Sequence, residues 1–187
     1  SQRFMKSYFK DQFGNSKMFG FSENGTLYIN DRQFNRAMRN GNENQRALLS
    51  GMKEAINDNE TVNVHINEKS DKFKLSNETW ERDITTDRSG AIFPPDRKFS
   101  DYNLIINDTR ASSETYESTI SIMTPKAKTF LNTNLKTGQS ASSVFMHETL
   151  DEFLNYFIKG GTNNPVDYQN KALENKGQAP RTATDHQ

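Results

Sequence analysis

The chain has 187 residues, and its 24 Lys and Arg balance its 24 Asp and Glu, so the formal net charge is zero. It contains no Cys, which excludes disulfides, thiolate nucleophiles, Cys-ligated zinc and iron–sulfur clusters. Balanced charge also argues against nucleic acid as a partner, because phosphate binding requires an excess of Lys and Arg on one face. Any catalysis must therefore use His, carboxylate or hydroxyl groups.

Length and hydropathy favour one domain without a membrane span. Only 32% of the residues are hydrophobic, but 13 Phe and 6 Tyr supply enough apolar area for a modest core. No apolar run approaches the roughly 18 residues that cross a bilayer, and the first residues lack the apolar stretch of a secretion signal. The start at Ser1 instead of Met suggests a processed product or a segment excised from a longer polypeptide.

The N-terminal third of the chain shows helix and hairpin patterns. Apolar residues at a spacing of three to four predict a short helix over 1–14. Two short apolar runs on either side of a turn that ends in Asn-Gly predict a hairpin over 17–30. Helical periodicity then predicts two helices, over 31–40 and 43–57.

The middle of the chain contains the clearest strand. Residues 61–67 alternate polar and apolar side chains with period two. This alternation predicts that His65 faces outward, while three apolar side chains face the core: Val62, Val64 and Ile66.

Weaker patterns follow this strand. Residues 68–102 are charged and contain Gly and Pro breakers, which predicts an irregular flap or a partly disordered segment. Residues 104–106 and 116–123 are short β candidates that could extend the sheet.

The C-terminal third turns helical. Ser142 or Ser143 can cap a helix whose apolar positions run to Gly160-Gly161. Asn164 before Pro165 then predicts the start of another helix, ending near Asn175. Together these patterns predict an α+β fold: a small, mostly antiparallel sheet flanked by helices, with a C-terminal helical pair.

A chemical motif lies in the first of these C-terminal helices. His147 and Asp151 are four residues apart and project from one helical face, as the two zinc-binding His do in H-E-x-x-H. An Asp oxygen is also an accepted zinc ligand. Glu148 follows the first ligand directly, so it is the natural general base toward a water molecule at the metal.

A catalytic zinc needs a third protein ligand from another element. Asp167, just inside the last predicted helix, is our choice, and Glu174 and His186 are the alternatives. Each also has a purely structural interpretation: a helix N-terminal acid, a surface acid and a tail residue. His65 is expected to be solvated and not a ligand.

The motif also has a structural interpretation without metal. His147 and Asp151 can form a hydrogen bond between successive turns of a solvated helical face, while Glu148 and Glu152 face water. A non-catalytic interaction domain with a defunct site would carry the same residues in this helix. A hydrolase that uses magnesium and carboxylates is a third alternative.

The order of elements over residues 43–187 resembles the C-terminal toxin domains of bacterial Rhs/YD-repeat polymorphic toxins, in particular zinc metallopeptidases related to the NleD-type effector proteases. The resemblance is carried by a helix reading RALLSGMKEAI, a strand reading VNVHI, the segment SASSVFMHETLDEF and the C-terminal stretch VDYQNKALENKGQAPRTATDH. The family helix carries H-E-x-x-H. This sequence has His147 and Glu148 in the matching places and departs from the motif at Asp151.

The resemblance implies a zinc-dependent endopeptidase that acts as a bacterial effector or toxin domain, secreted or delivered as part of a larger polypeptide. It implies a protein or peptide substrate and an immunity protein as partners. The length predicts a single domain over 1–187, and the resemblance implies that 43–187 form a metallopeptidase-like core, with 1–42 as an N-terminal helix and hairpin appendage. The departure at Asp151 favours the alternative, a catalytically inactive metallopeptidase-like interaction domain.

Overall fold

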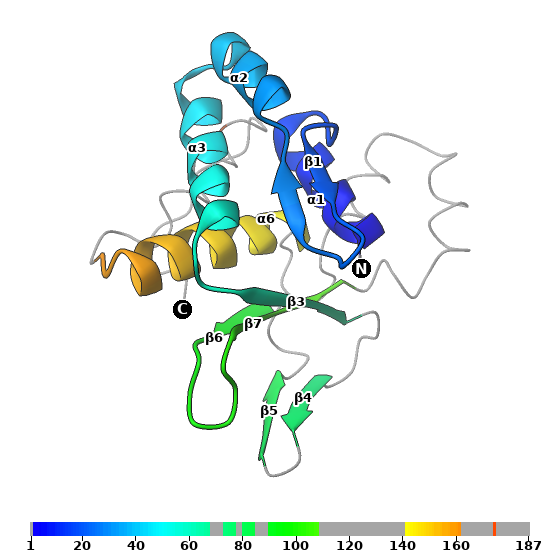
Figure 1. Ribbon diagram of the computed structural model, residues 1–187, viewed down its shortest axis with the longest axis vertical. Helices are drawn as coiled ribbons and strands as arrows, with labels where there is room; N and C mark the ends of the chain where they lie inside the picture. The colour runs from blue at the N-terminus through cyan, green and yellow to red at the C-terminus, as the bar shows by residue number, and fades with distance from the viewer. Residues whose placement is uncertain are drawn as a thin grey trace. The chain divides into compact units, whose positions relative to one another are not determined.

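The computed structural model describes residues 2–67, 73–77, 80–84, 90–108, 141–161 and 174 (Figure 1). Contacts group the chain into two compact units, one formed by Ser1–Asn59 with Phe145–Gln187 and the other by Glu60–Val144. The α+β fold predicted from the sequence is confirmed. Within the described ranges, no helix is long and apolar enough to cross a bilayer.

The first unit begins with the elements predicted for the N-terminal third. In chain order they are helix α1 (Gln2–Phe13), the antiparallel strands β1 (Phe19–Phe21) and β2 (Leu27–Ile29), and helices α2 (Asp31–Asn40) and α3 (Glu43–Asn57). Gly25, in the hairpin turn, has a φ of 83°, a conformation that Gly adopts without steric cost. Side chains of Asn30 and Asn42 accept hydrogen bonds from backbone N–H groups of the first turns of α2 and α3, so both helices have a defined start.

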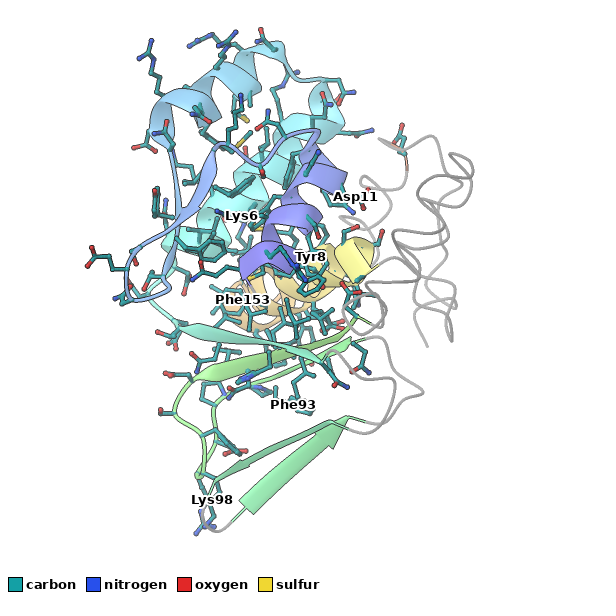
Figure 2. All side chains as sticks on the ribbon, turned by 90° about the vertical axis from the view of Figure 1, so that its right-hand side faces the viewer. Lys6, Tyr8, Asp11, Phe93, Lys98 and Phe153 are labelled. Atoms are coloured by element: carbon teal, nitrogen blue, oxygen red, sulfur yellow. The ribbon has the colours of Figure 1, made fainter. Side chains whose placement is uncertain are left out.

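An aromatic cluster joins these elements to the C-terminal helix of the same unit. The ring of Phe9 in α1 stacks on Phe19 in β1 with centroids 3.9 Å apart, and meets Phe145 edge-on at 5.6 Å. The ring centroids of Tyr8 and Phe145 are also 5.6 Å apart. Tyr8 and Phe153 are each only 1% exposed among the packed side chains of this unit (Figure 2). The predicted appendage 1–42 therefore shares its core with the helix that carries the candidate site.

The second unit contains a three-stranded sheet in the order β3-β7-β6 and a separate hairpin. The sheet consists of β3 (Val62–Asn67), β7 (Tyr102–Asn107) and β6 (Gly90–Phe93), and the hairpin of β4 (Phe73–Asn77) and β5 (Trp80–Ile84). Strand β7 is central, parallel to β3 and antiparallel to β6 (Figure 1). The β4–β5 and β1–β2 pairs are antiparallel as well, so the prediction of mostly antiparallel pairing is confirmed.

The prediction of an irregular flap over 68–102 is wrong for the described part of that segment. It contains β4, β5 and β6, and β7 begins at its end. A two-stranded antiparallel ribbon is held by backbone hydrogen bonds and can stay solvated, so its sequence need not show a continuous apolar pattern. The predicted strand at 104–106 is confirmed within β7, while the one at 116–123 lies outside the described residues.

A row of polar side chains lies on one face of the parallel β3–β7 pair. Asn67 Nδ2 donates to Asn107 Oδ1 at 2.8 Å, and both residues are buried, at 6% and 4% exposure. His65 Nε2 lies 3.1 Å from Asn103 Oδ1. The prediction that His65 simply faces outward is therefore wrong, because its half-buried ring is held by a neighbouring strand. These bonds favour the observed register, since a slip of one residue would move each polar side chain to the other face.

We expect Asn67→Ala to lower the free energy of unfolding by about 1–3 kcal/mol, because it removes a buried hydrogen bond from Asn107. In a double-mutant cycle with Asn107→Ala, the two losses should be less than additive, with a coupling of about 1 kcal/mol. Urea denaturation measures both quantities. Asn63→Ala, at an exposed position of the same face, is the matched control with a smaller loss. Additive losses at Asn67 and Asn107 would contradict the assigned contact.

Candidate functional site

The helix predicted up to Gly160-Gly161 is present and carries the motif. It begins as α6 (Ala141–Met146) and continues as η2 (His147–Ile158), a π-helix. Gly160, with a φ of 61°, ends it. The predicted caps are wrong: Ser142 and Ser143 are buried within α6, whereas a capping side chain must lie at the first residue before the helix.

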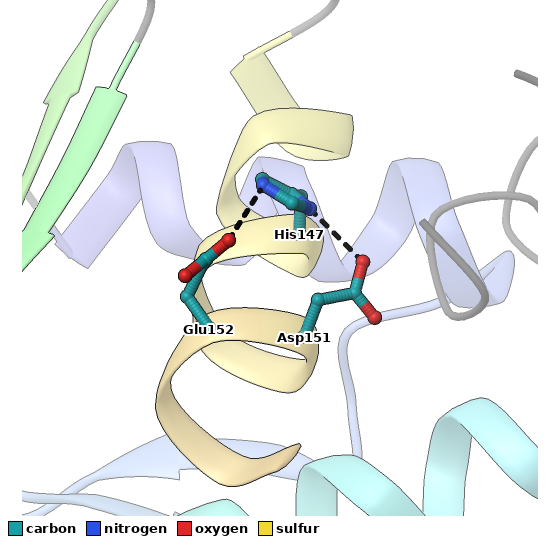
Figure 3. Close-up of polar contacts among 3 residues, drawn as sticks. All are labelled: His147, Asp151 and Glu152. Atoms are coloured by element: carbon teal, nitrogen blue, oxygen red, sulfur yellow. Dashed lines mark hydrogen bonds and ion pairs between the residues drawn. The ribbon is translucent and has the colours of Figure 1, made fainter. Parts of the chain in front are cut away.

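The π-helical turn decides which side chains meet His147. Its backbone hydrogen bonds join residues five apart, so each turn holds more than the about 3.6 residues of an α-helix. The side chains four and five positions after a given residue then lie on either side of it, one turn further on. For His147 these are Asp151 and Glu152 (Figure 3).

Both ring nitrogens of His147 face a carboxylate. Nδ1 lies 2.9 Å from Asp151 Oδ2, which is a hydrogen-bond distance, and Nε2 lies 3.5 Å from Glu152 Oε1 (Figure 3). Asp151 is fully buried at 0% exposure, whereas the Glu152 side chain is 23% exposed. The imidazole is therefore held between one buried carboxylate and one carboxylate that reaches solvent.

The surrounding acids change the protonation of the imidazole. Burial by itself lowers the pKa of His147, but the hydrogen bond with Asp151 and the negative charges of Glu148, Asp151 and Glu152 outweigh it and raise the pKa above the usual 6.5. Because the three carboxylates stabilise the imidazolium, metal binding at this ring must displace a proton.

The raised pKa predicts how stability depends on pH in a metal-free buffer with chelator. The folded protein binds the proton more tightly than the unfolded chain, so the contribution of His147 is fully present below pH 6.5 and is lost as pH rises through the folded-state pKa. The difference in free energy of unfolding between the wild type and His147→Gln should therefore shrink as pH rises from 6 to 8.5 in urea denaturation. A difference that grows with pH would contradict this protonation.

The structure brings together part of the predicted metal site. His147, Glu148 and Asp151 are buried side chains of one helix, with Glu148 at 9% exposure. Glu174 is described and its side chain is exposed, whereas Asp167 and His186 lie outside the described residues. Among the residues that the structure describes, no group of three or more His, Asp or Glu side chains is placed to hold a metal ion. The third ligand therefore stays a prediction.

Sequence reasoning missed the position of Glu152 at this site. In an α-helix, side chains five positions apart do not lie on the same face of the helix. Glu152 was accordingly predicted to face water. Only the wider π-helical turn places it opposite Nε2. No local sequence signal distinguishes that turn from the α-helix which the apolar spacing predicts.

The donor atoms fit the metal that the motif implies. An imidazole nitrogen and carboxylate oxygens are ligands that zinc accepts, and Glu148 beside them can serve as a base. Two of these donors, His147 Nδ1 and Asp151 Oδ2, lie 2.9 Å apart. The chemistry of the residues therefore permits a zinc site on η2.

Comparisons with known proteins add no family to this geometry: no family model, curated protein or solved structure matches the chain at a significant level. The chemistry of a candidate activity must therefore be argued from the residues of the site.

Proposed function

We propose that this chain is a zinc-dependent endopeptidase that acts as a bacterial effector or toxin domain. The observation that carries the proposal is the buried His147 imidazole, which lies among three carboxylates of the same helix. Zinc bound at this ring would polarise the scissile carbonyl and lower the pKa of a water molecule.

Glu148 is the general base in this proposal. Its carboxylate accepts a proton from the attacking water as the water oxygen bonds to the scissile carbonyl carbon, and then gives that proton to the amine nitrogen when the C–N bond breaks. Its position directly after His147 on η2, at 9% exposure, supports this role. Asp167 remains our choice for a third ligand.

The effector assignment depends on the resemblance to the toxin domains of Rhs/YD-repeat polypeptides. In that setting the substrate is a protein or peptide of a target cell, the domain is secreted or delivered as part of a larger polypeptide, and an immunity protein protects the producing bacterium.

One observation favours a second function, an inactive interaction domain with a metallopeptidase-like scaffold. The hydrogen bond between His147 and Asp151 and the raised pKa of the ring stabilise a protonated imidazole, which cannot bind metal. In that case the bridge between successive turns would only stabilise the helix.

Zinc content and thermal stability distinguish the two functions. The purified domain should contain zinc, and its Tm should fall on chelation, because a ligand present at 100 times its Kd stabilises the native state by about 2.7 kcal/mol. Differential scanning calorimetry with and without chelator measures the change. Re-addition of zinc should restore the Tm, with magnesium as the control ion. A metal-free protein whose Tm does not change with either ion would support the function as an interaction domain.

Glu148→Gln should abolish hydrolysis while zinc content is retained, because it removes the base but no ligand. We expect a loss of about 10²–10⁴-fold, the usual contribution of a general base. Cleavage of a peptide library, followed by mass spectrometry, measures the activity. Glu23→Gln, the same change at an exposed position of the turn between β1 and β2, is the matched control and should leave cleavage unchanged. Full activity of Glu148→Gln would exclude the assigned role.

A further inference from the structure

The two carboxylates that flank His147 differ in distance and in burial. Asp151 Oδ2 lies 2.9 Å from Nδ1, an ordinary N–H···O distance, whereas Glu152 Oε1 lies 3.5 Å from Nε2, beyond the range of a good hydrogen bond. Asp151 is fully buried, and the side chain of Glu152 is 23% exposed. Nε2 therefore faces the carboxylate that is partly exposed to solvent.

The geometry of zinc separates these two contacts further. Zinc binds imidazole nitrogen at about 2.0–2.1 Å and carboxylate oxygen at about 2.0–2.2 Å in a tetrahedral arrangement, so two such ligands are about 3.3–3.5 Å apart. The 3.5 Å between Nε2 and Glu152 Oε1 matches this separation. The 2.9 Å between Nδ1 and Asp151 Oδ2 is shorter and matches a direct hydrogen bond.

We infer that His147 Nε2 and Glu152 bind zinc, and that Asp151 is a positioning residue that accepts a hydrogen bond from Nδ1–H. The inference rests on the proposed function and assigns the carboxylates of its metal site. A carboxylate on the far nitrogen is a common partner of a metal-bound His, because it fixes the tautomer and the orientation of the ring. The sequence prediction, in contrast, used Asp151 as a ligand.

This division of roles also explains why two neighbouring acids lie beside one ring. In a π-helix a single turn presents residues four and five positions away to the same side chain. One acid can then hold the ring from within the core while the next supplies a ligand at the surface. Glu148 keeps its role as the base and is not needed as a ligand.

Zinc titration of purified variants tests the inference. Competition with a chromophoric chelator gives the zinc affinity of the wild type, Glu152→Gln, Asp151→Asn and the control Glu23→Gln, at an exposed position of the β1–β2 turn. Loss of a ligand in Glu152→Gln should weaken binding by more than about 100-fold, whereas Asp151→Asn, which keeps an acceptor for Nδ1–H, should weaken it about 10-fold. A larger loss for Asp151→Asn than for Glu152→Gln would overturn the inference.

Nitrogen-15 NMR of the zinc-loaded wild type gives a second readout that a merely structural role of Asp151 would not produce. The chain has 3 His, so His65→Gln and His186→Gln suffice to assign the signals of His147. Metal at Nε2 and a proton at Nδ1 are expected, and metal at Nδ1 would overturn the inference. The NMR spectrum and the zinc affinity of Glu152→Gln test whether Nε2 and Glu152 bind zinc, even if Asp151→Asn does not fold.

The outcomes separate this inference from the function on which it rests. A wild type that binds no zinc overturns the proposed function together with the inference. Zinc bound at His147 with unchanged affinity in Glu152→Gln overturns only the inference and leaves the peptidase proposal standing.

Discussion

The hydrogen bond between the imidazole of His147 and the fully buried carboxylate of Asp151 governs the candidate site. A buried charge is costly unless it is paired, so these two groups fix each other's position and protonation. The bond leaves one ring nitrogen on the side of a partly exposed acid. Each role assigned to the neighbouring carboxylates follows from this orientation of the ring.

The π-helical backbone of η2 and the aromatic core of the first unit support that bond. Phe145 directly precedes the site on the helix and contacts the rings of Tyr8 and Phe9. Helix α3 packs against η2, and Lys159 at the end of η2 lies 2.8 Å from Glu54 of α3. The N-terminal elements thus hold the helix in place, which gives them a part in the site that no residue of the motif reveals.

Elements with local patterns could be predicted from the sequence, and elements that depend on distant partners could not. The hairpin at 17–30 and the helix over 43–57 carry turn and periodicity signals within a few residues. The strands β4 and β5 pair through their backbones, and the parallel partner of β3 lies far along the chain. No local sequence pattern therefore predicts either arrangement. A sequence shows which residues could pair but not which of them do.

The same limit applied at the site. The spacing of His147 and Asp151 predicted their contact, because residues four apart meet in any helix of similar pitch. The approach of Glu152 needed the wider turn of η2, for which the sequence carries no local signal. The identity of the third ligand depends on tertiary structure that spacing alone does not determine.

A crystal grown with zinc and measured at the zinc absorption edge would test the central claim most directly, since anomalous scattering places the metal independently of any assumed ligand. The account predicts a zinc peak about 2.0–2.1 Å from Nε2 of His147. A zinc-saturated crystal with no anomalous peak beside His147 would contradict it.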